Sequence, residues 1–142
     1  MPDKSVHIPQ SAILPYRIRK SALEILLITS IGSGRWVLPR GHIEPELTAR
    51  QSAIKEAFEE AGINGKVPRT SFGTYTYRKD DRPDSLPYHV EVFTMRVTYM
   101  MDSWPEELRR TREWMSASKA SNSVDEKELR SMILAFAEEI ER

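Results

Sequence analysis

Three glutamates, Glu56, Glu59 and Glu60, have the spacing that places carboxylates on one face of a helix. Residues at positions i, i+3 and i+4 lie within one turn, so their side chains are neighbours. Like charges at this spacing repel each other by roughly 0.2–0.5 kcal/mol per pair. A bound cation would offset that repulsion, and closely spaced oxygen ligands suit a hard divalent ion such as Mg²⁺ or Mn²⁺. A solvated helix face is the alternative interpretation of these residues taken alone.

The helix expected to carry these glutamates has recognisable ends. Thr48, followed three residues later by Gln51, matches a capping box, so the helix is predicted to begin directly after Thr48. Gly62 is placed to end it in a left-handed conformation. Between these ends, a stripe of apolar residues is expected to pack closely against a sheet. The stripe consists of Ala49, Ala53, Ile54, Ala57, Phe58 and Ala61.

The rest of the chain is expected to supply strands and a second helix. Strands are predicted over residues 11–19, 23–29, 35–38, 71–78, 88–100 and 113–115, with a polar loop over 79–87. Ser123 and Glu126 form a second capping-box pattern, which predicts a C-terminal helix. The apolar stripe of that helix comprises Leu129, Met132, Ile133, Phe136, Ala137 and Ile140. This stripe is expected to pack in the core, with a homodimer surface as the alternative. Strands flanking two helices without regular alternation predict an α/β or α+β layered fold.

The composition limits the function classes. A chain of 142 residues predicts one domain, here over residues 11–142, preceded by a flexible N-terminal arm over residues 1–10. The formal net charge is zero, which argues against nucleic acid or an anionic membrane as a partner. The sequence has no cysteine, which excludes disulfides, thiolate metal sites and thiol nucleophiles. Without a signal-peptide pattern or a long apolar run, the chain is expected to be cytoplasmic.

The stretch from Gly41 to Ile63 resembles the signature of the Nudix hydrolases. That signature runs glycine, five residues, Glu, seven residues, Arg-Glu, an apolar residue, any residue, Glu-Glu, any residue, glycine and an apolar residue. The residues in register are Gly41, Glu56, Ala57, Glu59, Glu60, Gly62 and Ile63. Two positions depart from it: Leu47 replaces the first Glu, with Glu46 one residue early, and Lys55 replaces the Arg.

The resemblance extends on both sides of this stretch. Residues 35–39 leading into 41–45, and the later Trp104-Pro-Glu and Arg112-Glu-Trp, are similar to the diphosphoinositol polyphosphate and diadenosine polyphosphate branch. The implied fold is an α/β/α sandwich with a mixed sheet between helices. The implied activity is metal-dependent hydrolysis of a diphosphate linkage, using Mg²⁺ or Mn²⁺, with a diadenosine polyphosphate or a diphosphoinositol polyphosphate as the favoured small-molecule substrate.

The resemblance also implies roles for individual residues. Glu56, Glu59 and Glu60 correspond to the catalytic and metal-binding glutamates, and the carbonyl of Gly41 to a further metal ligand. Which glutamate accepts the proton varies in the family, so that role stays open. Glu91, on a predicted strand, is a distant alternative as base or ligand.

Arginines outside the motif are candidates for gripping the substrate. Arg35, Arg40 and Arg78 are expected to bind phosphates, because guanidinium matches phosphate oxygens, with ordinary surface charges as the alternative.

Two other functions remain open. A sugar-nucleotide or nucleoside-triphosphate pyrophosphatase fits the motif equally well. A degenerate Nudix domain that binds a ligand without turnover is supported by Leu47 and Lys55, and opposed by the intact glutamates.

Overall fold

The computed structural model describes residues 6–79 and 84–142. The arm expected over residues 1–10 is wrong in its C-terminal part, because strand β1 (Ile8–Arg19) already includes residues 8–10. These residues pair in parallel with residues 88–90 of strand β7 (Tyr88–Met100), and this pairing holds them in the sheet. The arm's residues 1–5, and residues 80–83 of the loop predicted over 79–87, lie outside the described ranges.

The strands of the described chain form one eight-stranded mixed sheet. Its main order is β3-β2-β1-β7-β5, while β4 pairs with β1, β6 with β7 and β8 with β2. Within the described residues, β1 and β7 run parallel to each other and the other pairs are antiparallel. The remaining strands are β2 (Ala22–Thr29), β3 (Trp36–Val37), β4 (Arg40–His42), β5 (Ile63–Lys66), β6 (Gly73–Tyr77) and β8 (Arg112–Ser116).

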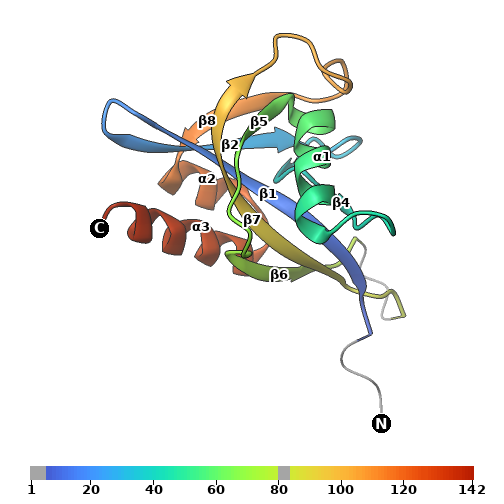
Figure 1. Ribbon diagram of the computed structural model, residues 1–142. Helices are drawn as coiled ribbons and strands as arrows, with labels where there is room; N and C mark the ends of the chain where they lie inside the picture. Colours follow the sequence, from blue (N-terminus) through green and yellow to red (C-terminus); the bar gives the residue numbers. More distant parts are fainter. Residues whose placement is uncertain (1–5, 80–83) are drawn as a thin grey trace.

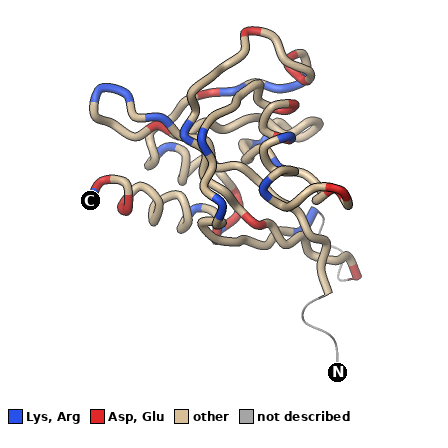
Figure 2. Tube along the Cα trace, in the orientation of Figure 1, with Lys and Arg blue, Asp and Glu red and all other residues tan. Residues whose placement is uncertain are grey.

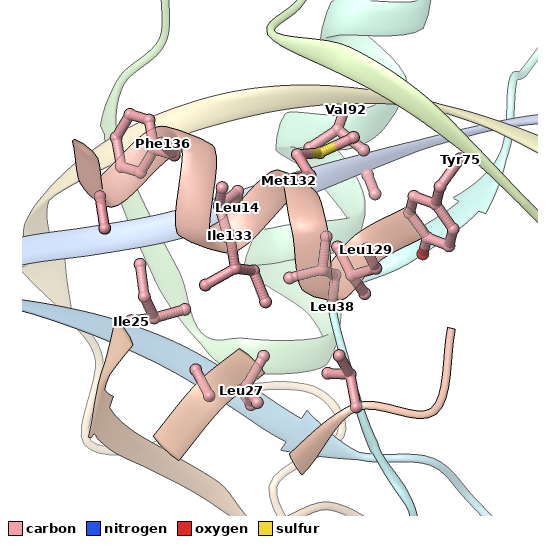
Figure 3. Packing of buried hydrophobic residues seen from close by; sticks show 14 of the residues in the cluster. Leu14, Ile25, Leu27, Leu38, Tyr75, Val92, Leu129, Met132, Ile133 and Phe136 are labelled. Atoms are coloured by element: carbon pink, nitrogen blue, oxygen red, sulfur yellow. The ribbon is translucent and has the colours of Figure 1, made fainter. Parts of the chain in front are cut away.

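Helices cover both faces of this sheet (Figure 1). Helix α1 (Ala49–Ala61) packs its alanines on one face, against residues such as Ile13 and Phe93. Helices α2 (Ala117–Ser123) and α3 (Lys127–Ile140) cover the other face. Figure 3 shows Leu129 and Ile133 of α3 among the sheet residues Leu14 and Ile25. The predicted α/β/α sandwich with a mixed sheet is therefore confirmed.

Helix α1 has the ends that its sequence predicts. Thr48 is the N-cap, and its reciprocal hydrogen bonds with Gln51 complete the capping box. Gly62 ends the helix with φ of 66°, in the left-handed region. The predicted apolar stripe is wrong at Phe58, which is 38% exposed to solvent.

The C-terminal part of the chain differs more from the prediction. The second capping box is wrong: Glu126 is the N-cap of α3 but makes no side-chain capping bond, and Ser123 instead ends α2. The apolar stripe of α3 packs in the core, as expected. Three short elements, α2, β4 and β5, were not predicted. Each is too short for a repeating pattern of apolar residues to be recognised in the sequence. None of the helices in the described ranges has the length and hydropathy needed to cross a membrane.

Candidate active site

The C-terminal half of α1 buries the carboxyl group of Glu60. Glu60 is 8% exposed, and the two oxygens of its carboxyl group have different partners. Oε1 accepts a hydrogen bond from the backbone N–H of Arg40 at 3.1 Å. Oε2 forms an ion pair with Nη2 of Arg110 at 3.2 Å. Burial raises the pKa of Glu60 to about 8, although Arg110 and the Arg40 N–H both oppose that shift.

Glu56 lies next to Glu60, one helical turn earlier. The two carboxyl groups are close enough for each to affect the pKa of the other. Burial also raises the pKa of Glu56, and the nearby charge of Glu59 adds to the effect. Neighbouring carboxyl groups with raised pKa values form a site where a bound cation can replace a proton.

Gly41 brings strand β4 against this pair. A Cβ atom at position 41 would lie 2.5 Å from Cδ of Glu56 and 2.9 Å from its Oε1. A side chain at position 41 would displace the carboxyl group of Glu56, so glycine lets the backbone approach it. The position predicted as a backbone ligand therefore lies directly beside Glu56.

The three predicted glutamates are not equivalent in the structure. Glu60 is buried, whereas Glu56 and Glu59 are both half-buried, and the charge of Glu59 acts on Glu56. Within residues 6–79 and 84–142, no three carboxylate or imidazole side chains are gathered into a metal-binding group. The local geometry thus provides two paired oxygen ligands, with Glu59 close by.

The C-terminal end of α1 is closed by the segment of residues 101–112 that leads from β7 into β8. The last four carbonyl groups at a helix end lack partners within the helix. Here four consecutive carbonyls, from residue 59 to residue 62, each accept a hydrogen bond from this segment. The donors are Glu106 N–H at 3.1 Å, Trp104 Nε1 at 3.1 Å, Arg112 Nη1 at 2.8 Å and Met101 N–H at 2.8 Å.

Trp104 explains why residue 62 must be glycine. A Cβ atom there would lie 2.7 Å from Cγ of Trp104, in addition to the strain of the positive φ. The guanidinium of Arg112 stacks on the same indole, 3.8 Å from the centre of the Trp104 ring. The segment is therefore packed tightly on the last turn of α1.

The N-terminal end of α1 differs in character. Lys55, the residue at the motif's Arg position, bonds to Glu44 at 2.7 Å, and both side chains are over 40% exposed. Leu47, at the position of the motif's first Glu, is half-buried, and its backbone N–H bonds to the carbonyl of Glu44. Neither departure from the motif is in contact with the Glu56–Glu60 pair through a hydrogen bond or ion pair within the described residues.

The three predicted substrate arginines line one cavity of about 530 Å³. Arg35 and Arg78 are exposed; Arg35 pairs with Asp125 at 3.1 Å, and Arg78 donates to the carbonyl of Ser85. A second cavity of about 260 Å³ shares part of this lining, including Lys79, and reaches Glu60 and Arg110. Glu60 therefore lines a cavity together with Arg110 and Lys79, whereas Arg35 and Arg78 line only the first cavity.

The guanidinium of Arg40 is not available to bind a ligand in the same way, because other residues already contact it. Its guanidinium donates to Tyr75 Oη at 2.9 Å and to Glu126 at 3.2 Å, and lies 3.8 Å above the ring of Tyr77. Burial opposes its charge, but Tyr75, Tyr77 and Glu126 outweigh burial and raise the pKa of Arg40. Arg40 thus links β4 to the start of α3 and supplies its backbone N–H to Glu60.

Sequence reasoning missed Arg110, the cation in contact with Glu60. No pattern in the sequence distinguishes it from its neighbour Arg109, because its importance arises from a contact between residues 50 positions apart. Glu91, the distant alternative, lies on β7 opposite Ser11, which pairs with Gly41 on its other side, and forms no hydrogen bond or ion pair with the three glutamates among the described residues. Figure 2 shows basic residues at the β1–β2 turn and acidic residues in the segment after β7.

The chain belongs to the Nudix family, since the NUDIX domain model matches residues 9–136. It is 29% identical over 127 residues to Nudix hydrolase 21, chloroplastic, of Arabidopsis thaliana, covering 87% of this chain and 63% of that protein. It is 29% identical over 113 residues to diphosphoinositol polyphosphate phosphohydrolase 3-alpha of Mus musculus, covering 78% of this chain and 65% of that protein. The chain therefore spans slightly less than two thirds of the length of these curated relatives.

Among solved structures, the chain resembles an Ap4A hydrolase of C. elegans. The TM-score is 0.77 at 21% identity, with 95% of this chain and 99% of that chain covered. At this identity the likeness establishes the fold. The family predicted from the motif is confirmed, and proteins of the branch that the flanking segments resemble are among those to which the chain is similar.

Nudix hydrolases generally use divalent metal ions, and the described residues fit such an ion in part. Glu56 and Glu60 offer neighbouring hard oxygen ligands, and Gly41 leaves room for close approach of its backbone. The metal-binding role of Glu56, Glu59, Glu60 and Gly41 stays a prediction.

Proposed function

We propose that the chain is a metal-dependent pyrophosphohydrolase that cleaves a diphosphate linkage, with Mg²⁺ or Mn²⁺ held at Glu56 and Glu60 and with Glu59 nearby. The observation that carries this proposal is the buried carboxyl group of Glu60, adjacent to Glu56, at a cavity that Arg110 and Lys79 also line. A buried carboxylate of this kind is costly unless a cation or proton is bound, so its presence favours a binding role.

Each of the site residues has a separate role in the proposed reaction. A bound divalent ion would stabilise negative charge on the phosphoryl oxygens and favour deprotonation of water. Glu56 and Glu60 would hold the ion, and Glu59, which has access to solvent, would complete its surroundings. Gly41 keeps β4 close to Glu56, so that the backbone carbonyl at this position can serve as the predicted further ligand. Which glutamate accepts the proton is left open.

The cavity supports a polyphosphate substrate. Arg35, Arg78 and Lys79 line it, and guanidinium groups can bind phosphate oxygens through two nitrogens at once. The favoured substrates are a diadenosine polyphosphate and a diphosphoinositol polyphosphate, in line with the names of the similar proteins. A sugar nucleotide or a nucleoside triphosphate is the second enzymatic candidate, because the site residues do not distinguish these compounds.

A substrate panel tests the proposal. The protein is incubated with Mg²⁺ and diadenosine tetraphosphate, a diphosphoinositol polyphosphate, ADP-ribose, a sugar nucleotide and ATP, and product release is measured. Hydrolysis of at least one compound that stops on adding EDTA is expected. No hydrolysis of any diphosphate compound would contradict the proposal and favour a domain that binds without turnover.

A substitution at Leu47 separates the enzyme from the binding domain. Leu47→Glu restores the first Glu of the motif, so it should raise an activity that already exists. In a domain without turnover, the same substitution leaves hydrolysis undetectable. Lys55→Arg provides the matching test at the second departure from the motif.

We also propose that the substrate is a small molecule, rather than nucleic acid or a membrane surface, and that the protein acts in the cytoplasm. The zero net charge and the intermixed acidic and basic residues support a small-molecule partner. Retention on DNA and on anionic vesicles, measured at about 150 mM salt to match physiological ionic strength, tests this part. Strong retention on either support would contradict it.

A further inference from the structure

The guanidinium of Arg110 contacts the glutamate pair from outside the motif. We propose that Arg110 is a positioning residue that fixes the carboxyl group of Glu60 for the hydrolysis proposed above, on which this inference rests. Its place in the structure, rather than its place in the sequence, indicates this role.

Both oxygens of Glu60 have a fixed donor. Arg110 Nη2 contacts Oε2 at 3.2 Å, and the backbone N–H of Arg40 contacts Oε1 at 3.1 Å. The terminal torsion of a glutamate side chain is otherwise broad, with no sharp rotamer. With one donor on each oxygen, the plane of the carboxyl group is set, and the lone pairs that remain can point only in limited directions.

Arg110 is itself anchored through its other two nitrogens. Nε donates to Glu106 at 2.7 Å, and Nη1 donates to the backbone carbonyl of Thr29 at 3.0 Å. The side chain of Arg110 is 11% exposed. Each of the three guanidinium nitrogens therefore has its own acceptor, which uses the rigid planar fork that lysine lacks.

The segment that carries Arg110 is fixed as well. Glu106, the partner of Arg110, donates its backbone N–H to the carbonyl of Glu59, and Trp104 donates to that of Glu60. The same segment thus binds the backbone and the side chain of the last turn of α1. Strand β2 and this segment therefore fix the position of the Glu60 carboxyl group through Arg110.

The motif's own cation does not perform this task. Lys55 is paired with Glu44 at an exposed position. Among the residues that the structure describes, Arg110 is the side-chain cation that forms an ion pair with any of the three glutamates. The orientation of Glu60 therefore depends on a residue 50 positions away.

Hydrogen exchange at the Arg40 amide tests the inference without any activity assay. This amide donates to Glu60, so its exchange with D₂O reports whether the carboxyl group stays in place. Exchange in Arg110→Ala is expected to be about tenfold faster than in the wild type, approaching the rate in Glu60→Ala, which lacks the acceptor. Arg109→Ala is the matched control, because Arg109 is exposed and its side chain forms no hydrogen bond or ion pair within the described residues. Unchanged exchange in Arg110→Ala would overturn the inference.

Kinetics provide the second readout. In Arg110→Ala, kcat at saturating Mg²⁺ is expected to fall about 10- to 100-fold, with KM for the substrate changed by less than about threefold, because positioning rather than substrate binding is lost. Arg110→Lys keeps the charge without the fork, so it should recover only part of kcat. If Arg110→Ala does not fold, Arg110→Lys and Glu106→Gln carry both measurements, with smaller changes in the same direction. Faster amide exchange with an unchanged kcat would overturn the positioning role. If the wild type hydrolyses no diphosphate, the proposed function fails, and the amide result still decides whether Arg110 holds Glu60.

Discussion

The two ends of helix α1 are held in different ways. At the N-terminal end, Thr48 and Gln51 cap each other, and Lys55 pairs with Glu44 on the surface. At the C-terminal end, the side-chain donors to the last carbonyls come from residues 44–51 positions further along the chain, and Glu60 is buried. The exposed N-terminal end of the helix is thus capped by neighbouring residues. The C-terminal end, which carries the carboxyl pair, is capped by residues from a distant segment.

The largest expected effect comes from removing one member of that pair. Glu56→Gln keeps the size of the side chain but loses the charge that would hold a divalent ion. Mg²⁺-dependent hydrolysis is expected to fall by about 10²–10³-fold, which is typical of losing a group that stabilises charge in the transition state. Glu44→Gln, at the other end of the helix, is the control and should change the rate by less than about twofold. Equal rates in Glu56→Gln and the wild type would contradict the site.

The pH dependence of stability also distinguishes the two ends. In EDTA, the pKa of Glu60 is about 8 in the folded protein, against 4.5 for the ordinary group. The raised pKa means that the folded state binds the proton more tightly, so the stability is fully present below pH 4.5 and is lost as the pH rises towards 8. The loss is expected to reach about 5 kcal/mol at most, at about 1.4 kcal/mol per unit of pKa, measured by urea unfolding across this window. Glu60→Gln should flatten the curve, and an equally steep curve in that variant would assign the effect to other groups.

Tight packing at the C-terminal end can be tested with two glycines of similar conformation. Gly62 has φ of 66° and faces Trp104, whereas Gly34 has φ of 71° and open space within 4 Å of the position that a Cβ atom would take. Gly62→Ala is expected to lower the free energy of unfolding by about 2–3 kcal/mol, because strain and a clash add together. Gly34→Ala should lower it by only about 1 kcal/mol. Equal losses in urea unfolding would mean that Trp104 moves away without cost.

The smallest effect is expected at the exposed end. Lys55→Met removes the ion pair with Glu44, which solvent and salt already weaken. Hydrolysis should stay within about twofold of the wild type, and the melting temperature within about 2 °C. A tenfold loss of activity would instead place Lys55 in the active site.

The same difference between the two ends decides what the sequence could predict. Thr48 and Gly62 were identified as the ends of α1 because capping depends on residues a few positions apart. The strand over 88–100 was predicted with its observed bounds, because it is long and apolar. The family motif identified Glu56 and Glu60 as a site, but not that Glu60 is buried while Glu56 and Glu59 stay half-buried.

What the sequence could not predict depends on contacts between distant segments. Arg110 reaches Glu60 only because β2, β8 and the segment between β7 and β8 are assembled around α1. Arg40 was predicted to bind phosphate, yet its guanidinium is bound by Tyr75 and Glu126, which lie on other elements. Phe58 follows the helical apolar spacing and is still exposed, since no element covers that part of the helix among the described residues.

The central claim is that the carboxyl pair of Glu56 and Glu60 holds the divalent ion, and Mn²⁺ binding tests it most directly. Electron paramagnetic resonance measures free Mn²⁺ as it is titrated into the protein without substrate. Mn²⁺ is expected to bind the wild type and Glu44→Gln with the same affinity, and to bind the double variant Glu56→Gln/Glu60→Gln at least about tenfold more weakly. Equal Mn²⁺ affinity in the double variant and the wild type would contradict the claim.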